Sequence, residues 1–269
     1  MKEELISVIL TVYNGEKTII ETLQSLLNQS YKNFEIIVVD DYSTDSSVEI
    51  IKNFINEKRI DQIKLFYSPE KGRSKALNYA ISKSKGMFLA NIDADDLAHP
   101  YRLEKQFEFF RHNSKYGLVS SKSEIIFNNQ LPKWQQVNVK ENDFEIVNNK
   151  LRVTNPISHP GIMVNFNVIE KEHFFYNEKL DKVVDYELWL RLYEKGIKMA
   201  ILNDKLIAKR IHNNQSFENK KRIQYLKAIK NVQLNTSKNL SLKESFLINL
   251  KFIYGLLPQK IRMIIRGRI

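Results

Sequence analysis

The alternation of two apolar patterns over the first hundred residues constrains the fold of this chain more than any other feature. Short runs rich in β-branched residues alternate with segments whose apolar residues recur at helical spacing. Strands that are apolar throughout, separated by helices, indicate a parallel sheet with helices on both faces. The pattern predicts strands at 5–12, 34–39, 63–67 and 87–92, and helices at 19–27, 48–55 and 74–85.

The rest of the chain is less regular. A stretch rich in Asn and other polar residues, 128–180, has no clear periodicity, and we interpret it only as irregular structure. The 269 residues suffice for one large domain or for a domain with an appendage. We expect a helix after Pro100, a strand at 117–127, a helix at 185–194, a strand at 206–211, and helical structure from Ser216 to the end with breaks near Gly255 and Pro258.

The net charge of +11 is distributed unevenly along the chain. Residues 205–269 contain 15 Lys and Arg but only two acidic residues, Glu218 and Glu244, whereas residues 1–204 contain 27 Lys and Arg and 29 Asp and Glu. The excess of positive charge therefore belongs to the C-terminal quarter. A nucleic-acid-binding protein is disfavoured, because most of the chain is slightly acidic and lacks a basic-aromatic surface motif.

Three features predict a cytoplasmic protein. The chain has no cysteine, which excludes disulfides and thiolate metal sites and fits a reducing compartment. Its first residues do not resemble a signal peptide, because Glu3 and Glu4 follow Lys2 and the apolar run at 5–12 is short. No segment approaches the roughly 20 apolar residues that a membrane-spanning helix requires.

Acidic clusters follow the second and the fourth expected strands, at residues 40–41 (DD) and 93–96 (DADD). Ligands of parallel sheets bind beyond the carboxyl ends of the strands, so both clusters should lie at the ligand-binding edge. Neighbouring carboxylates repel one another unless a cation lies among them, and oxygen ligands suit Mg²⁺ or Mn²⁺. A solvated acidic turn with a helix cap is the open alternative for 93–96, and helix capping also explains 40–41.

Two common nucleotide-binding classes are disfavoured because their motifs are missing. A P-loop NTPase requires a GxxxxGK[ST] sequence, which this chain lacks. A Rossmann dehydrogenase requires GxGxxG after its first strand, and no such sequence follows the strand at 5–12.

Eight segments, in this order and spacing, resemble a known family. They are ILTVYNGE (9–16), VVDDYSTD (38–45), GRSKALNYAISKSKG (72–86), NIDADD (91–96), LAHPYRLEKQ (97–106), SHPGIMV (158–164), VVDYELWLRL (183–192) and KRIHNNQS (209–216). Together they are similar to the family 2 glycosyltransferases of GT-A fold, and closest to bacterial enzymes that build lipopolysaccharide, capsule and other surface glycans. The resemblance covers about residues 5–216. It implies a Rossmann-like α/β fold, with a mixed, mainly parallel sheet flanked by helices.

The resemblance implies a nucleotide diphosphate sugar as the donor, with uridine the usual base. In this family the residue that matches Tyr13 stacks on the base, and Arg73 or Lys75 is placed to reach the phosphates. The positions that match the donor site are Thr11, Tyr13, Asp41, Arg73, Asn78 and Asp93.

The resemblance also implies Mn²⁺ or Mg²⁺ as a cofactor. Asp95 matches the metal site, with Asp93 and Asp96 beside it in the same cluster. His212, in the segment KRIHNNQS, matches a position near the donor diphosphate, where it is an extra metal ligand or a phosphate contact.

Asp185 matches the catalytic base of the family. The implied reaction is a single displacement that inverts the anomeric carbon, in which Asp185 takes the proton of the acceptor hydroxyl. Many relatives have an acidic pair where this chain has Val184-Asp185. The alternative role for Asp185 is the N-cap of the helix at 185–194.

The predicted organisation is a GT-A domain followed by a tail. Residues 1–120 bind the nucleotide sugar, and residues 121–215 supply the acceptor side and the catalytic base. Residues 216–269 form a basic amphipathic helical tail, which suits the surface of an anionic membrane, or else packs on the domain with a solvated basic face. The protein is then cytoplasmic and peripheral to the inner face of the cytoplasmic membrane.

The expected function is transfer of a sugar to a glycan or a lipid-linked acceptor, with no nucleic acid as a partner. A catalytically inactive module that binds a sugar nucleotide or a glycan is the alternative. Such a module is free to lose either Asp95 or Asp185, and this chain keeps both.

Overall fold

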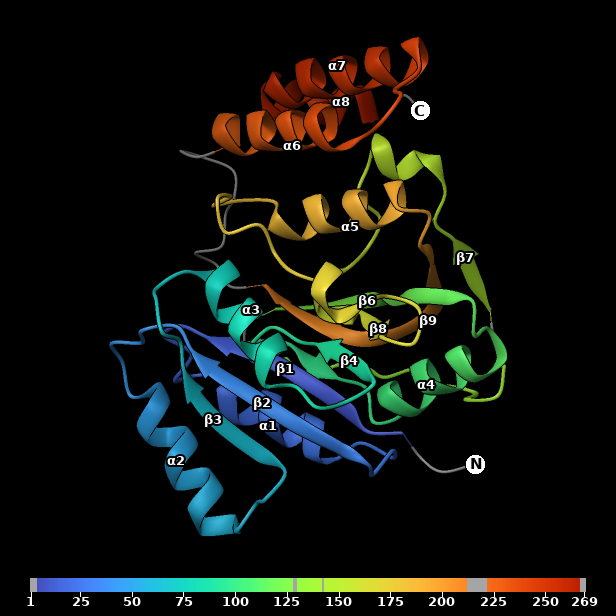
Figure 1. Ribbon diagram of the computed structural model, residues 1–269. Helices are drawn as coiled ribbons and strands as arrows, with labels where there is room; N and C mark the ends of the chain where they lie inside the picture. The colour runs from blue at the N-terminus through green and yellow to red at the C-terminus, as the bar shows by residue number, and fades with distance from the viewer. Residues whose placement is uncertain (1–3, 128–129, 142, 212–221, 267–269) are drawn as a thin grey trace.

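A single mixed sheet of nine strands forms the centre of the computed structural model, which describes residues 4–127, 130–141, 143–211 and 222–266. The strand order is β3-β2-β1-β4-β8-β6-β9-β5, and β7 pairs with β9 (Figure 1). The strands are β1 (Ile6–Val12), β2 (Phe34–Asp40), β3 (Ile63–Tyr67), β4 (Phe88–Asn91), β5 (Leu97–Ala98), β6 (Tyr116–Phe127), β7 (Phe144–Ile146), β8 (Met163–Asn165) and β9 (Lys198–Ile211).

The four strands formed by the first hundred residues at one end of the sheet, β3, β2, β1 and β4, run parallel, as their buried apolar sequences predicted. Their register places Val12 opposite Asp40 and Ile9 opposite Asn91. The carboxyl ends of β1, β2 and β4 therefore meet at one edge, where the chain continues into the acidic segment 93–96. The predicted α/β class is confirmed.

Two strands of the second half differ from the prediction. The short strand β8 lies antiparallel between β4 and β6, so one sheet spans both expected halves of the domain. It falls within 128–180, where three residues are too few to show a period. Strand β9 begins at Lys198 rather than at Leu206. Polar Asn203 and Asp204 interrupt its apolar pattern and form an irregularity, where the pairing with β6 passes from Leu202 to Lys205.

Helices cover both faces of the sheet and enclose two cores (Figure 1). One core contains apolar side chains of α1, α2 and α4, and the other contains those of α3 and α5. The helices are α1 (Ile19–Leu27), α2 (Ser47–Lys58), α3 (Arg73–Lys83), α4 (Arg102–His112), α5 (Val184–Glu194), α6 (Arg222–Thr236), α7 (Leu242–Leu256) and α8 (Gln259–Arg266).

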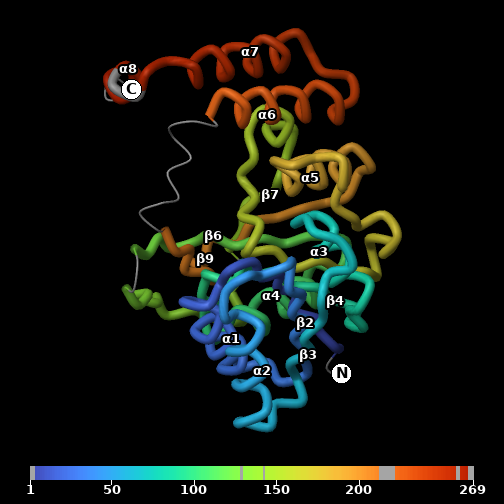
Figure 2. Tube along the Cα trace, turned by 90° about the vertical axis from the view of Figure 1, so that its left-hand side faces the viewer, coloured from blue at the N-terminus to red at the C-terminus, as the bar shows by residue number. Residues whose placement is uncertain are grey.

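The C-terminal helices stack outward from α5 (Figure 1, Figure 2). Helix α6 lies on α5 and buries Val232 and Gln233, and α7 lies on α6 and buries Ile248. A Cβ atom at Gly255 of α7 would lie 2.7 Å from Cδ2 of Leu226, so glycine allows the two helices to approach closely at this point.

The tail is helical as predicted, but its breaks differ. Gly255 lies inside α7, and the expected break falls at Leu257 and Pro258, between α7 and α8. A further break precedes Ser241, which forms a capping box with Glu244 at the start of α7. Within the described part of the chain, none of the helices combines the length and the apolar character needed to cross a bilayer.

Candidate active site

The carboxyl ends of the parallel strands and the first residues of α3 surround a pocket of about 520 Å³. Five residues that the sequence predicted for the donor and metal sites line it together: Thr11, Tyr13, Asp41, Arg73 and Asp95. Val12, Asn14, Gly15, Thr18, Lys71, Gly72 and Ala94 complete the lining. The expectation that segments far apart in the sequence meet at this edge therefore holds.

Gly72 connects the end of β2 to the start of α3. Its φ of +137° is a conformation that favours glycine, and its N–H donates to Oδ1 of Asp41 at 2.7 Å. Burial, with a smaller contribution from Asp40, raises the pKa of Asp41 despite this hydrogen bond. The contact places the amino-terminal end of α3, a region that attracts anions, at the pocket.

Lys71 is a pocket residue that the sequence analysis missed. Its ammonium group lies 5.0 Å from the centre of the Tyr13 ring, whose side chain is half exposed. The predicted alternative to Arg73, Lys75, instead forms an ion pair with Glu70 and is absent from the lining. The sequence did contain a signal for this role, because Lys71 comes directly before the segment GRSKALN.

Asp93 is already paired within the protein. One of its oxygens lies 2.9 Å from Arg73 and 3.5 Å from Nδ1 of His159. Burial by itself raises the pKa of Asp93, but Arg73 and His159 outweigh burial and hold the pKa well below its usual range. His159 in turn contacts the hydroxyl of Tyr176 through Nε2 at 2.9 Å. Asp93 is therefore ionised and anchors Arg73 at the pocket.

Asp96 points into the interior. Its Oδ1 accepts the backbone N–H of Arg210 at 3.0 Å, and its Oδ2 is buried without a hydrogen-bond partner among the described residues. Burial, reinforced by the charges of Asp93 and Asp95, raises the pKa of Asp96 to about 8. Arg210 also donates from Nε to the backbone carbonyl of Asp95 at 3.1 Å and pairs with Glu21 at 2.5 Å.

The three carboxylates thus occupy three environments, and only Asp95 lines the pocket. In the described part of the chain, they do not form a preassembled group of three metal ligands. This arrangement still fits Mg²⁺ or Mn²⁺, because such ions are commonly held by one or two carboxylates together with substrate phosphates. Oδ2 of Asp96, which is buried without a hydrogen-bond partner among the described residues, belongs to the residue that directly follows Asp95. His212, the fourth predicted ligand, lies outside the described residues.

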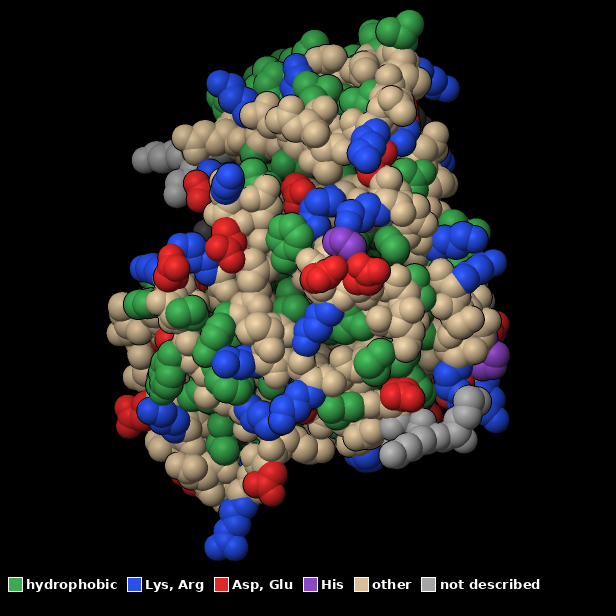
Figure 3. Space-filling view, viewed as in Figure 1, with side chains coloured by type: hydrophobic (Ala, Val, Ile, Leu, Met, Phe, Trp, Pro, Cys, Tyr) green, Lys and Arg blue, Asp and Glu red, His purple; other side chains and the backbone are tan. Residues whose placement is uncertain are grey.

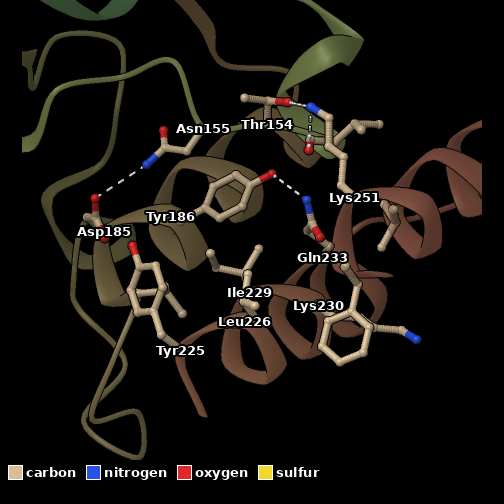
Figure 4. Close-up of a pocket in the computed structure, with 14 residues that line it drawn as sticks. Thr154, Asn155, Asp185, Tyr186, Tyr225, Leu226, Ile229, Lys230, Gln233 and Lys251 are labelled. Carbon is tan, nitrogen blue, oxygen red and sulfur yellow. Dashed lines mark hydrogen bonds between the residues drawn. The ribbon is translucent and has the colours of Figure 1, made fainter. Parts of the chain in front are cut away.

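Asp185 lies in the first turn of α5, but not at its N-cap. The N-cap position belongs to Val183, whose φ of 53° and ψ of 30° are strained for a β-branched residue, at a cost of about 1–2 kcal/mol. The capping alternative for Asp185 is therefore wrong, because the N-cap lies two residues earlier in the chain. Instead, one carboxylate oxygen accepts from Nδ2 of Asn155 at 3.4 Å (Figure 4).

Asp185 faces a second pocket, distinct from the donor pocket and lined by α5, α6 and α7. The two pockets are coupled electrostatically through Arg73. Asp93 is the largest influence that raises the pKa of Arg73 against the effect of burial, and Asp185 is the next. The charges of the acidic segment and of Asp185 therefore act on the same guanidinium group.

Asn78 does not belong to the pocket for which the sequence predicted it. Its amide donates to the carbonyl of Tyr176 at 2.9 Å and to Glu178 at 2.8 Å, and its carbonyl accepts the N–H of Tyr176 at 2.7 Å. These three hydrogen bonds join α3 to the segment 176–178. The contacts of Asn78 are therefore structural ones, outside the lining of the donor pocket.

The chain matches a described protein family over more than half of its length. The pattern of the family described as Glycosyl transferase family 2 covers residues 7–172. The chain belongs to this family. The site described above is therefore the active-site region of a family 2 glycosyltransferase.

Two relatives from Escherichia coli illustrate the similarity. The UDP-Glc:alpha-D-GlcNAc-diphosphoundecaprenol beta-1,3-glucosyltransferase WfaP is 31% identical over 268 residues, which cover 94% of this chain and 93% of that protein. The O-antigen biosynthesis glycosyltransferase WbnJ is 31% identical, with 79% of this chain and 82% of that protein covered.

Solved structures of glycosyltransferases share the fold. S. aureus TarS, residues 1–349 in complex with UDP-GlcNAc, superposes with a TM-score of 0.67 at 19% identity, over 93% of this chain and 72% of that one. The mannosyltransferase PcManGT from Pyrobaculum calidifontis, in complex with GDP-Man and Mn²⁺, gives a TM-score of 0.66 at 17% identity, over 92% and 68%. The predicted GT-A fold is confirmed.

Replacement of Asn78 separates its structural role from a role in donor binding. Asn78→Ala removes three hydrogen bonds, and we expect the free energy of unfolding to fall by about 1–3 kcal/mol. Nucleotide affinity should stay unchanged, whereas Tyr13→Ala should weaken it without loss of stability. Urea denaturation and calorimetric titration with UDP measure both. An Asn78→Ala protein of normal stability that binds UDP poorly would contradict this assignment.

Proposed function

We propose that this protein transfers a sugar from a UDP-sugar onto an acceptor hydroxyl, with inversion at the anomeric carbon. The observation that carries the proposal is the convergence of Thr11, Tyr13, Asp41, Arg73 and Asp95 on one pocket. Glycosyltransferases of the same fold were solved with UDP-GlcNAc and with GDP-Man, and WfaP is named for UDP-Glc.

Four residues of the pocket have a proposed chemical task in this reaction. The exposed ring of Tyr13 offers a stacking surface for the base, and Arg73 and Lys71 bring positive charge toward the diphosphate. Mn²⁺ or Mg²⁺ held by Asp95 would neutralise charge on the departing diphosphate. Asp93 acts indirectly, because its ion pair orients Arg73.

Asp185 is the proposed general base. It lies in the first turn of α5 and lines the pocket formed with α6 and α7. An ionised carboxylate is a weak base, which is adequate when the hydroxyl proton leaves late in the displacement. The hydrogen bond from Asn155 to one oxygen orients the Asp185 carboxylate. The other carboxylate oxygen is the one proposed to take the proton of the acceptor hydroxyl.

The acceptor is proposed to be a lipid-linked sugar in the synthesis of a surface polysaccharide. This proposal rests on the match to WfaP over nearly the full length of both chains, and on the O-antigen role named for WbnJ. The expected division into a catalytic domain at 1–215 and a tail at 216–269 belongs to the same proposal.

The tail is further proposed to lie on an anionic membrane. Hydrophobic side chains gather over the end of the molecule formed by α7, on the side turned away from α6 (Figure 3). The tail is also rich in basic residues, and apolar and basic residues together suit an anionic lipid surface. The exposed apolar residues are Leu242, Phe246, Leu250, Ile253 and Leu256 of α7, and Ile261, Met263, Ile264 and Ile265 of α8.

Metal dependence is the first test of the reaction. Chelation by EDTA should abolish release of nucleotide diphosphate from a panel of sugar nucleotides, and Mn²⁺ or Mg²⁺ should restore it. Asp95→Asn should remove the activity without unfolding the protein, because the backbone contact with Arg210 remains. Asp181→Asn, an exposed acidic residue outside the pocket, is the control. Full transfer in excess EDTA would rule the metal out, and no turnover of any donor would favour an inactive binding module.

Asp185→Asn tests the base. Asparagine is nearly isosteric but cannot accept the proton, so we expect the rate of transfer to fall by about 10²–10⁴-fold. Affinity for UDP and Mn²⁺ should change little, because the donor pocket does not include Asp185. Stopped-time transfer assays and calorimetry on the same preparation measure both effects. Transfer at a near wild-type rate would exclude Asp185 as the base.

Sedimentation with liposomes tests the membrane surface. The protein should bind phosphatidylglycerol vesicles more strongly than phosphatidylcholine vesicles, and added salt should weaken binding. Phe246→Glu combined with Ile253→Glu should reduce binding, because both side chains are exposed on the apolar face of α7. Leu131→Glu, equally exposed but on the catalytic domain, should not. Equal binding to both lipids, or binding to neither, would contradict the proposal.

A further inference from the structure

The proposed base, Asp185, lies where the catalytic domain meets the tail. It lines a cavity of about 360 Å³, with α5 and residues 153–155 on one side and helices α6 and α7 of the tail on the other (Figure 4). The pattern of the family ends at residue 172, so it assigns no role to the side chains that α6 and α7 bring to this cavity. The surroundings of Asp185 are therefore a place to look for further functional residues.

Hydrogen bonds on both sides of Asp185 in the sequence fix the position of α6 on α5. Lys182, which precedes Asp185 by three residues, donates from Nζ to Oε1 of Gln224 at 3.4 Å. Tyr186 directly follows Asp185, and its hydroxyl accepts from Nε2 of Gln233 at 3.1 Å. The first turns of α6 are therefore held against the start of α5.

Tyr225, in the first turn of α6, is directed at Asp185. Figure 4 shows its hydroxyl turned toward the Asp185 carboxylate, which Asn155 approaches from a different direction, and all three side chains line the cavity. Burial raises the pKa of Tyr225, and the negative charge of Asp185 raises it further. The hydroxyl therefore keeps its proton at neutral pH and is a hydrogen-bond donor beside a carboxylate.

Two other tyrosines lie near Asp185, but their hydroxyls have other partners. Burial, and after it the charge of Asp185, raises the pKa of Tyr176, yet the hydroxyl of Tyr176 contacts Nε2 of His159 at 2.9 Å. The hydroxyl of Tyr186 points away from Asp185 in Figure 4 and donates to a backbone carbonyl at 2.6 Å. Of these three tyrosines, Tyr225 is therefore the one whose hydroxyl faces the carboxylate.

We propose that Tyr225 is a positioning residue for the proposed base, and that its hydroxyl donates a hydrogen bond to the Asp185 carboxylate. Together with Asn155, it fixes the direction in which this carboxylate faces the acceptor hydroxyl. A carboxylate offers about four lone-pair positions, so two such hydrogen bonds leave room for the acceptor. The inference rests on the proposed role of Asp185, and it goes further because the tail then supplies part of the catalytic machinery.

A base that is oriented from the tail makes the chemical step depend on how the tail is docked. The turn that carries Tyr225 is held on α7, because Arg222 donates to the carbonyl of Gly255, where the two helices approach closely. A misplacement of about 1 Å in an active site costs on the order of 10²-fold in rate. Donor binding uses the other pocket, so the contribution of Tyr225 should appear in kcat and not in affinity for the donor.

Tyr225→Phe tests the inference, because it removes the hydroxyl and keeps the ring. Transfer is measured with Mn²⁺, the sugar nucleotide that the protein turns over, and an alkyl diphosphate of N-acetylglucosamine as the acceptor. We expect kcat to fall by about 10-fold, with the KM values of donor and acceptor little changed, because a hydrogen bond to a charged group is lost. In an Asp185→Asn protein the same change should have little further effect, because the carboxylate through which Tyr225 acts is already gone.

Tyr254→Phe is the matched control. It removes a tyrosine hydroxyl of α7 that donates to the carbonyl of Arg262 at 3.2 Å, outside the cavity, and it should transfer at the wild-type rate. Wild-type kcat in Tyr225→Phe, a change confined to the KM of the acceptor, or equal losses with and without Asp185 would each overturn the inference. Near wild-type transfer by Asp185→Asn alone would count against the proposed base instead.

The contact itself is measured without turnover. Carbon NMR of protein isotopically labelled at tyrosine Cζ gives a signal for Tyr225, identified by its absence from Tyr225→Phe. Asp185→Asn should move this signal more than that of Tyr254, because the carboxylate lies beside the Tyr225 hydroxyl. A Tyr225 signal that does not respond to Asp185→Asn would overturn the inference, whatever the activity of the protein.

Discussion

The interactions of Arg210 hold the acidic segment on which the rest of the active site depends. This residue of β9 is almost fully buried, and it contacts the carboxylate of Asp96, the backbone of Asp95 and the carboxylate of Glu21. Thr22 of α1 adds hydrogen bonds to the same turn from the other side. Hydrogen bonds from β9 on one side and from α1 on the other therefore hold this turn in place. Asp95 therefore stays directed at the donor pocket.

The two pockets share no lining residue, but the charges of Asp93 and Asp185 both raise the pKa of Arg73. Arg73 is fixed by Asp93 on the donor side and responds to the charge of Asp185 on the other. The donor pocket is built by strands and loops of the GT-A sheet, whereas the pocket at Asp185 needs α6 and α7. The donor pocket is thus formed by the common fold, whereas the pocket at Asp185 depends on how the tail docks on α5.

Much of the fold was predictable because its signals are local. β1, β2 and β4 are buried, continuous apolar runs, and α1 and α4 place their apolar residues at helical spacing. β8 was missed because a three-residue strand is defined by its neighbours β4 and β6 rather than by its own pattern. The start of α5 was placed too late by one residue, because nothing in the sequence announces a valine in the left-handed conformation at Val183.

By itself the sequence determined which residues stand at the carboxyl ends of the strands, and hence that Thr11, Asp41 and Asp95 share one pocket. The local pattern shows where each strand ends, and parallel pairing brings the carboxyl ends of the strands to one edge of the sheet. Only the tertiary structure decided that Asn78 binds a distant backbone segment, and that residues of α6 and α7 line a pocket with Asp185. Those partnerships join residues far apart in the chain, and they arise from the way α6 and α7 dock on α5, which no local pattern encodes.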